Sequence, residues 1–384
     1  MSIIIFLLAI SCLVVIHELG HYLAARMFGV KADEFGFGFP PRLIGFVRVG
    51  KKWKRVKGED QTKYANTIWS LNWLPLGGFV RIKGEEKEGI NDKDSIHVKP
   101  IWQRIVIISA GVIMNWALAT VLFIAIFVGG TDAYLADVPA SAHIVNRHVV
   151  ISDVIVDSPA AKAGIEPGDT VVSVQGTTLG SSTDVRNAII AQGTSPVTVG
   201  VVRDGASKTF NVTPAVLAET GHPGLGVAMD DIGVVTFSFP QAVYYGARMT
   251  VMTTQSIVLE LGAVGKQILF AHSVPADVSG PVGIAVMAGH VAKQGWAPFL
   301  QFAALLSVNL AVINFLPIPA LDGGRVLFLI IEKIRRKPIS RTLEIGIHNV
   351  AFILLILLIF FVTLHDISRY GGAIVGGVKG MVGL

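Results

Sequence analysis

Two histidines and a glutamate near the start of the chain have the types and the spacing of a metal-dependent hydrolase. The motif His17-Glu18-Leu19-Gly20-His21 follows an apolar stretch with no charged residue at positions 2–16. On a helix, His17 and His21 face the same side and can share a zinc ion. Glu18 can then act as general base on a water molecule. Because ionisable groups at membrane depth usually mark function, the motif indicates hydrolysis within or at the edge of a bilayer.

Two simpler explanations remain open when this segment is taken alone. A five-residue match of this kind also arises by chance in soluble proteins. An apolar N-terminal segment can instead be a signal peptide, although this one has no basic region before the apolar run and no small-residue cleavage site after it. A third metal ligand and a membrane setting elsewhere in the chain would decide in favour of hydrolysis.

The composition predicts an integral membrane protein that also has a part outside the membrane. Of the 384 residues, 52% are hydrophobic and only 15% are charged, and the mean hydropathy is +0.61. Soluble domains usually carry about 25% charged residues. Uncharged runs long enough to cross a bilayer predict four transmembrane helices. We place them at residues 1–28, 101–130, 294–324 and 345–365.

Basic residues are distributed unevenly between the connections. Residues 26–104 contain 16 Lys and Arg, and residues 325–341 contain six. The much longer region 131–293 contains eight, and the tail after Tyr370 contains one. Membrane topology therefore accounts for the basic segments, and they do not require a nucleic-acid partner.

The positive-inside rule turns this distribution into an orientation. The connections at 29–100 and 325–344 are expected in the cytoplasm, and region 131–293 outside. Both termini, including the tail at 366–384, are then extracytoplasmic. We expect a multi-pass protein of the cell inner membrane, with the active site near the cytoplasmic side.

Two segments of the first cytoplasmic connection have the pattern of β structure. Aromatic residues alternate with glycine in Phe35-Gly36-Phe37-Gly38-Phe39, and Leu74–Ile82 reads as short strands interrupted by a Pro/Gly turn. Non-helical backbone near a membrane is tolerated where it is buried in protein or lines a wet cavity. Both segments could be hairpins that dip toward the metal site, or ordinary cytoplasmic loops with a little β structure.

A third metal ligand is found near the end of the third predicted span. Asp322 follows an apolar run, is flanked by Gly323 and Gly324, and can bring a carboxylate to a metal held by two histidines. Since Cys12 is the only cysteine, thiolate ligand sets are excluded. The alternatives are that Asp322 is a helix-end residue at the interface, or that Asp366 is the ligand.

Polar side chains in the second and third spans are candidates for contact with a peptide. Pro317 and Pro319 remove backbone donors and open the helix, which leaves carbonyl groups and the Asn309 and Asn314 amides available. Asn115 in the second span is either a hydrogen-bonding group between packed helices or a group near the active site.

Residues 131–230 contain a compact α+β domain that is inserted between the second and third spans. The sequence of Ser158–Asp169 resembles that of bacterial PDZ domains. Such a domain implies an extended peptide bound by strand addition. Pro223–Val227 resembles the carboxylate-binding loop but lies at the other end of the domain, so capture of a C-terminus stays open. The predicted strands and helices are 149–156, 158–164, 170–175, 184–192, 197–203 and 208–213.

The segment between this domain and the third span is amphipathic. Its uncharged stretches are too short to cross a bilayer, so we expect residues 231–293 to lie on the outer membrane surface. Ser279–Ile284 is expected to be a turn.

Taken together, these motifs resemble the site-2 protease family of intramembrane zinc metalloproteases, and most closely the bacterial regulator of sigma-E protease group in a form with one PDZ domain. The resemblance covers nearly the whole chain. The second span has Gly111 and Asn115 but lacks the proline that is often present in this motif. It implies a polytopic α-helical membrane protein with four transmembrane helices, membrane-associated β-hairpin segments and an inserted α+β PDZ domain.

The resemblance also implies roles for individual residues. His17, His21 and Asp322 would hold one Zn²⁺ per chain, and Glu18 would be the catalytic base. The segments Phe35–Phe39 and Leu74–Ile82 would pair with the substrate as strands. The residues expected to contact the substrate are Asn309, Asn314, Phe35, Gly36, Phe37 and Gly38.

The family acts on single-pass membrane proteins after another protease has trimmed their outer domain, and typically releases a transcriptional regulator such as an anti-sigma factor in a stress response. Two other functions stay open: a catalytically inactive, membrane-anchored PDZ binding protein, and a transporter. The four spans show no inverted repeat, which argues against a transporter.

Overall fold

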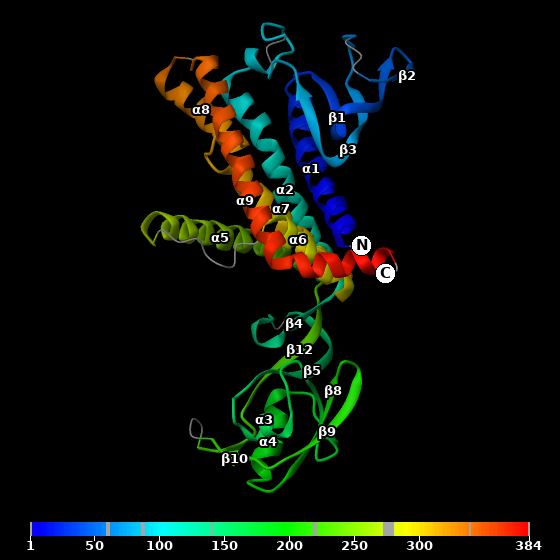
Figure 1. The fold of residues 1–384 in the computed structure, drawn as a ribbon, viewed down its shortest axis with the longest axis vertical. Coiled ribbons are helices and arrows are strands. Elements are labelled where there is room, and N and C mark those ends of the chain that lie inside the picture. The colour runs from blue at the N-terminus through cyan, green and yellow to red at the C-terminus, as the bar shows by residue number, and fades with distance from the viewer. Residues whose placement is uncertain are drawn as a thin grey trace. The chain divides into compact units, whose positions relative to one another are not determined.

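The computed structural model describes residues 2–58, 62–85, 89–139, 141–217, 221–271, 280–337 and 339–382. It divides into two compact units, and each is described by itself (Figure 1). Unit 1 comprises Met1–Ile124 and Val243–Leu384, and unit 2 comprises Ala125–Ala242. The helices of unit 1, two of which continue into unit 2, are α1 (Ser2–Met27), α2 (Ile101–Gly129), α5 (Phe239–Ala271), α6 (Pro281–Gln294), α7 (Trp296–Phe315), α8 (Asp322–Arg335) and α9 (Arg341–Val382).

Four of the described helices are long and apolar enough to cross a membrane. They contain the segments Ile4–Met27, Ile101–Gly129, Trp296–Phe315 and Thr342–Arg369, which agree with the four predicted spans. The most apolar stretch of α9 has no buried residue, so this helix presents large aliphatic and aromatic side chains on all sides. A helix that is hydrophobic all round is typical of contact with lipid.

The third predicted span is shorter than expected, because the prolines end it. Helix α7 stops at Phe315, and Pro317 and Pro319 lack the backbone N–H that would continue it. A connection follows in which Ala320 has φ = +80°, and α8 starts at Asp322. The expectation that residues 294–324 form one helix was therefore wrong. Asp322 lies in the first turn of the next helix.

Three other boundaries also differ from the sequence-based expectations. Most of the cytoplasmic connection 325–344 is the continuation of α8. The expected turn at 279–284 is instead the start of α6, which has Pro281 at its first position, while Ser279 lies outside the described residues. The expected tail 366–384 is helical as far as Val382, since α9 has no proline to end it.

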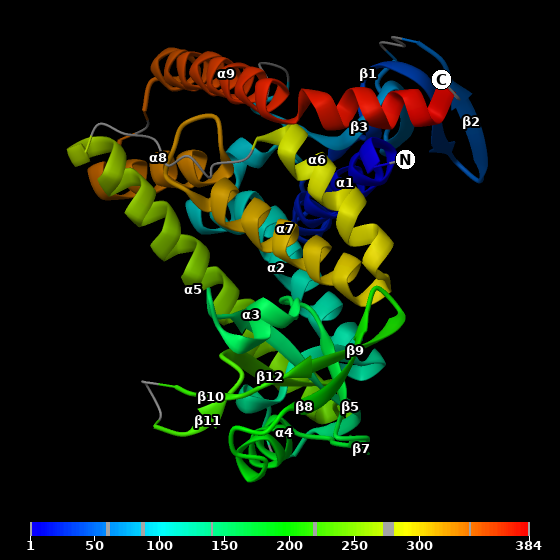
Figure 2. The same ribbon diagram turned by 60° about the horizontal axis from the view of Figure 1, so that its bottom comes forward.

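Helix α6 begins where a carboxylate from α9 satisfies its free backbone amides. Asp366, 1% exposed, accepts hydrogen bonds from the N–H groups of Gly280 at 3.1 Å and Gly283 at 2.8 Å. The first N–H groups of a helix have no partner within it, so this carboxylate takes the place of an N-cap side chain. Helix α6 then packs against α1, α7 and α9 (Figure 2).

Unit 1 also contains a β-sheet built from β1 (Ala32–Val49), β2 (Lys52–Val56) and β3 (Ile68–Ile82). Both long strands fold back on themselves. Phe35 pairs with Val80 on one side and with Trp69 on the other, and the first part of β3 also pairs with the second part of β1. The ladder therefore runs from residues 78–82 at one edge, through 32–37, 68–72 and 42–48, to β2 at the other edge. The edge at 78–82 lies against α1.

Unit 2 is a β-sheet with two short helices. The sheet order is β4-β12-β5-β6-β8-β9, with β7 paired to β6. Valine, isoleucine and leucine side chains of the strands and helices form its core. The bounds are β4 (Thr131–Tyr134), β5 (His143–Val154), α3 (Pro159–Ala163), β6 (Thr170–Val174), β7 (Thr177–Thr178), α4 (Ser182–Ala191), β8 (Val197–Arg203), β9 (Ala206–Val212), β10 (Ala215–Val216), β11 (Pro223–Gly224) and β12 (Val227–Thr236).

The predicted elements of this domain are confirmed to within a few residues, but its boundary at 230 was wrong. Residues 231–236 belong to β12, where they pair with β5 and partly with β4. The sequence of residues 231–236 does not show which strands this segment pairs with. Of the other described residues in the expected 231–293 segment, most belong to α5 or to α6.

A buried ion pair holds the turn before β6 to the end of β8. Asp169 is fully buried and receives hydrogen bonds from Arg203 Nε at 2.6 Å and Nη2 at 2.7 Å. The Asp169 carboxylate also accepts the Glu166 N–H at 3.0 Å. The hydrogen bonds from Arg203 hold the pKa of Asp169 below its ordinary value of 3.8. Because the folded pKa is depressed, this carboxylate contributes its full stability above about pH 4 and loses it as the pH falls toward the folded pKa.

We expect Asp169→Asn to lower the free energy of unfolding of unit 2 by about 2 kcal/mol at pH 7, because Arg203 loses a charged partner. The difference from the unsubstituted chain should shrink as the pH is lowered from 5 to 3. Pulse proteolysis of the full chain in urea measures this stability. Asp204→Asn, at an exposed turn position, is the matched control, and equal stability of the two variants at pH 7 would contradict the assignment.

Candidate active site

Helix α1 places two imidazole rings together on the side that faces α2. His17 and His21 are one turn apart and 5% and 7% exposed. Their Nε2 atoms are only 3.1 Å from each other, and the ring centroids are 4.8 Å apart. The helical repeat alone brings the two rings to one face, as the sequence predicted. One nitrogen of each ring therefore points to the same place.

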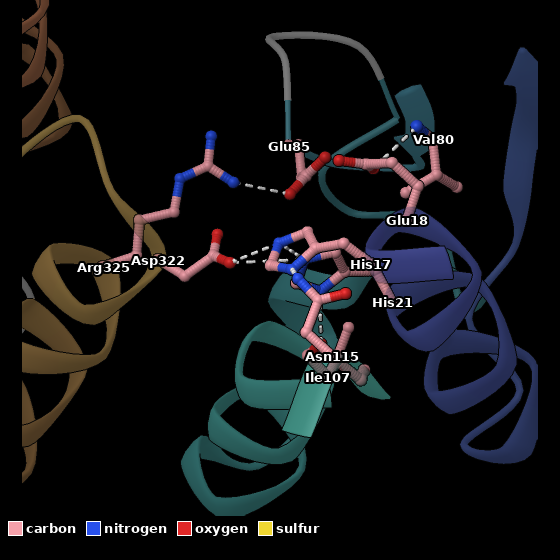
Figure 3. Close-up of polar contacts among 9 residues, drawn as sticks. All are labelled: His17, Glu18, His21, Val80, Glu85, Ile107, Asn115, Asp322 and Arg325. Carbon is pink, nitrogen blue, oxygen red and sulfur yellow. Dashed lines mark hydrogen bonds and ion pairs between the residues drawn. The ribbon is translucent and has the colours of Figure 1, made fainter. Parts of the chain in front are cut away.

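Asp322 brings a carboxylate to this place from 305 residues further along the chain (Figure 3). Its Oδ2 atom lies 3.0 Å from His17 Nε2 and 3.3 Å from His21 Nε2. Two imidazoles and a carboxylate are a donor set of catalytic zinc sites, which keep one further position open.

The outer ring nitrogens are held by α2. His21 Nδ1 donates to the Ile107 carbonyl at 2.9 Å, which leaves a lone pair on Nε2. His17 Nδ1 lies 3.2 Å from the side-chain amide nitrogen of Asn115, while Asn115 Oδ1 is buried with no hydrogen-bond partner among the described residues. If the amide is turned over, Oδ1 accepts the Nδ1–H of His17 and is satisfied.

This arrangement fits a bound cation. With both Nδ1 atoms protonated, the two Nε2 lone pairs and an anionic oxygen face one another at about 3 Å, which is unfavourable unless a positive charge lies between them. The residues present therefore match a zinc ion in donor type, number and outer hydrogen bonding. Asn115, for which two roles were open, lies against the site.

Glycines of α1 and α2 make the room for this site. A Cβ atom at Gly111 would lie 2.4 Å from His21 Nε2 and 2.6 Å from His17 Nε2. A Cβ atom at Gly20 would lie 2.4 Å from the Ala110 carbonyl oxygen, so the two helices can approach only because glycine stands there. The residue types of the second span do not by themselves show that these glycines border the histidines.

Glu18 points from α1 toward the edge of the sheet rather than toward α2 (Figure 3). Its Oε2 atom accepts the Val80 N–H at 3.0 Å, and about two turns earlier Ser11 Oγ accepts the Gly77 N–H at 3.1 Å. Side chains of α1 thus hold the edge of β3. The Glu18 carboxylate is therefore held at the edge of the sheet, on the same helix that carries both histidines.

The segment Phe35–Gly38 does not have the free edge that was expected of it. Residues 35–37 pair with β3 on both sides, and the Gly38 carbonyl accepts a hydrogen bond from Asn72 Nδ2 at 2.9 Å. These residues, Phe35, Gly36, Phe37 and Gly38, therefore lie inside the sheet and offer no second edge to a substrate strand. The alternating pattern correctly predicted a strand, but it contains no information on how many neighbours that strand has.

Asn309 and Asn314 both lie on α7 and are half-buried. Neither side chain forms a hydrogen bond with another described residue. Asp366, the alternative third ligand, lies instead at the start of α6, where its two oxygens accept backbone amides. The choice of Asp322 over Asp366 agrees with this geometry.

An ion pair lies next to the site on the side of α8. Arg325, one turn after Asp322, pairs with Glu85 at 2.7 Å, in the segment that follows β3 (Figure 3). Close by, the Ala320 N–H donates to His348 Nδ1 at 2.8 Å and fixes the turn that precedes the ligand. Neither contact can be predicted from the sequence, because each depends on how α8 and α9 pack.

Comparison with known proteins agrees with the site. The sequence profile of peptidase family M50 matches residues 5–56 and 60–358. A Clostridium perfringens protein with a provisional zinc-metalloprotease name is 34% identical over 96% of this chain and 98% of its own. The regulator of sigma-W protease RasP of Bacillus subtilis is 30% identical, covering 96% of this chain and 98% of its own, and the zinc metalloprotease RasP of Bacillus licheniformis is 31% identical, covering 96% and 99%.

Unit 2 was also compared with solved structures. The PDZ domain of the SdrC-like protein from Listeria monocytogenes is 21% identical and covers 21% of this chain and 85% of its own, with a TM-score of 0.20. Because this TM-score is low, the fold of unit 2 is described from its own strand order alone.

We expect Asp322→Ala to lower zinc affinity at least about tenfold, because two imidazoles alone hold the ion weakly. Asp322→Asn should also lose zinc, since a neutral amide is a poorer ligand than a carboxylate. Metal content of the purified protein, measured by mass spectrometry, tests both. Asp366→Asn keeps an acceptor for α6 and should retain zinc. A normal zinc content in Asp322→Ala would move the third ligand elsewhere.

We expect Gly111→Ala to reduce zinc affinity about tenfold or more, because the added methyl group would overlap both Nε2 atoms. Gly265→Ala on α5, where a Cβ atom meets nothing within 4 Å, is the matched control. Titration of each purified protein with a competing chelator measures the affinity. Equal affinities in the two variants would show that α2 lies further from the histidines.

Proposed function

Because the chain belongs to peptidase family M50 and is a zinc metalloendopeptidase of the site-2 protease type, we propose that it cleaves the transmembrane segments of single-pass membrane proteins. The observation that carries the proposal is the convergence of Asp322 with His17 and His21, which lie on an apolar helix long enough to cross a membrane. A hydrolytic site at this depth can reach a peptide bond that soluble proteases cannot.

The class of substrate is proposed from the chemistry of the site and from the name of one relative. The Bacillus subtilis relative is named a regulator of sigma-W protease, which supports an anti-sigma factor as the kind of substrate. In this proposal another protease first removes the outer domain of the substrate. The remaining stub is then short enough to reach a site enclosed by helices.

The residues of the site divide the work as follows. His17, His21 and Asp322 would hold the zinc ion, and Asn115 with the Ile107 carbonyl would keep the two rings in the required tautomer. When bound, zinc lowers the pKa of water toward neutrality and polarises the scissile carbonyl. Glu18 takes the proton from the attacking water and delivers it to the leaving amide nitrogen.

A substrate helix must unwind before its peptide bonds are exposed, and the sheet offers the replacement hydrogen bonds. In the described part of the chain, no strand pairs with the outer edge of Gly78–Ile82, and this edge lies beside Glu18. We assign the pairing of an extended substrate to this edge, in place of Phe35–Gly38, and in this proposal the substrate displaces Glu18 from the Val80 N–H. Asn309 and Asn314 are proposed as amide contacts to the same peptide from α7.

The orientation in the membrane is part of the same proposal. Basic residues concentrate in the connections that contain the sheet and α8. This supports a multi-pass protein of the inner membrane with the active site near the cytoplasmic side, and with unit 2 and both termini outside.

Unit 2 is proposed to meet the trimmed end of the substrate. In the described residues, no strand pairs with the second edge of β12 at Val227–Asp231, and α4 contacts this strand. An open strand edge beside a helix is a groove that an extended peptide can enter by strand addition. The unit then acts as a docking site or as a size filter.

We expect Glu18→Gln to abolish cleavage of a transmembrane substrate while zinc content stays normal, because only the proton acceptor is lost. The assay is single-turnover cleavage of a reconstituted anti-sigma-type protein whose outer domain has been removed. Glu260→Gln, on the exposed side of α5, should cleave as fast as the unsubstituted chain. Substantial activity in Glu18→Gln would exclude Glu18 as the base, and partner binding without turnover in the unsubstituted chain would favour an inactive PDZ binding protein.

A further inference from the structure

The hairpin formed by the second half of β1 and by β2 has two unlike faces. The register pairs Phe46 with Arg55 and Arg48 with Trp53, so these four side chains share one face. The opposite face carries Val47 and Val56, which are buried with Ile68 in a small core cluster. One face thus builds the fold, and the other remains exposed.

The free face exposes large apolar side chains. Trp53 is 63% exposed and Phe46 44%, and the neighbouring Trp69, which pairs with Phe46, is 39% exposed. We refer to Phe46, Arg48, Trp53, Arg55 and Trp69 as the hairpin face. Aromatic residues of this size, clustered on one side of a strand pair, need a partner that accepts apolar surface.

The hairpin face is also strongly cationic. From residue 35 to residue 58 the chain has seven Lys and Arg and no Asp or Glu. Arg42 is neutralised by the buried Glu34, and Lys54 lies over the Tyr64 ring. The other cations form no ion pair with a described residue: Arg48, Lys51, Lys52, Arg55 and Lys57.

The position of the hairpin face selects among the partners for such a surface. Trp69 packs against Tyr22 of α1 with ring centroids 5.3 Å apart, so the face continues the side of a membrane-spanning helix. Leu23 and Met27, at the same end of α1, are themselves exposed. Both views place β2 at the outer side of the sheet, away from α2 and α7 (Figures 1 and 2).

We propose that the hairpin face binds anionic phospholipid headgroups at the membrane surface. Trp and Phe side chains prefer the boundary between headgroups and acyl chains, and unpaired Lys and Arg attract anionic lipid phosphates. Arg48 and Arg55 present guanidinium groups that match phosphate oxygens in pairs. The contact fixes one edge of the sheet whose other edge holds Glu18, and so sets the depth of the active site in the bilayer. The proposal requires the membrane setting but not proteolytic activity.

The test measures lipid contact in the full chain without using cleavage. In a Cys12→Ser background, Trp53→Cys is labelled with an apolar fluorophore, and the protein is placed in nanodiscs of phosphatidylcholine with or without about one third phosphatidylglycerol. A quencher attached to the lipids reports contact. We expect quenching to be about threefold greater in the anionic discs, and the difference to disappear in high salt because the charges are screened.

Two variants complete the experiment. Replacing Arg48, Lys51, Lys52 and Arg55 by Gln should remove the difference between the discs, while normal zinc content shows that the protein is folded. A label at Asp204→Cys, in the hairpin turn of unit 2, should respond equally in both discs. The proposal is overturned if the label at position 53 responds equally in both discs, if the Gln variant keeps the difference, or if added RNA shields the label where lipid does not.

Discussion

The structure is organised around two buried histidines and a half-buried aspartate whose metal-ligating atoms converge. His17, His21 and Asp322 come from segments that are 305 residues apart, yet their ligand atoms all lie within 4.8 Å. Two imidazole lone pairs and a carboxylate cannot be buried together without a cation, since each would lose hydration with no compensating partner. In the proposed mechanism, the ion that makes hydrolysis feasible would also tie α1 to α8.

The surrounding helices serve this constraint in different ways. Helix α2 supplies a glycine face for close approach and two groups that fix the histidine rings. The prolines after α7 end that helix and allow α8 to begin at the ligand. Asp366 holds the start of α6, which packs against the helix that carries the motif. None of these residues reacts in the proposed mechanism, but each helps to position the groups that do.

How much could be predicted from the sequence depended on whether a signal was local. The i, i+4 histidines, the apolar spans and the strands of unit 2 have periods that the sequence displays directly. Pro317 and Pro319 also predicted an open helix, although not that Asp322 would begin the next one. The role of Asn115 could not be decided, because it depends on which ring nitrogen packs against it.

Strand neighbours were the least predictable feature. Phe35–Gly38 was correctly expected to be extended, but β3 returns to occupy both of its sides, and such pairing depends on contacts more than 30 residues away. The pairing leaves Gly78–Ile82 as the edge next to Glu18. At the opposite side of the same sheet lies the cationic hairpin face. One sheet thus connects the proposed membrane contact with the catalytic base.

The most direct test of the central claim is X-ray absorption spectroscopy at the zinc edge of the purified, active protein. The account predicts four light-atom neighbours at about 2.0–2.1 Å, with the multiple scattering of two imidazole rings and no sulfur. In Asp322→Ala, any zinc that remains should show the same two rings and one oxygen neighbour replaced or lost. A sulfur shell at about 2.3 Å, a third imidazole, or an unchanged spectrum in Asp322→Ala would contradict the assignment of the site.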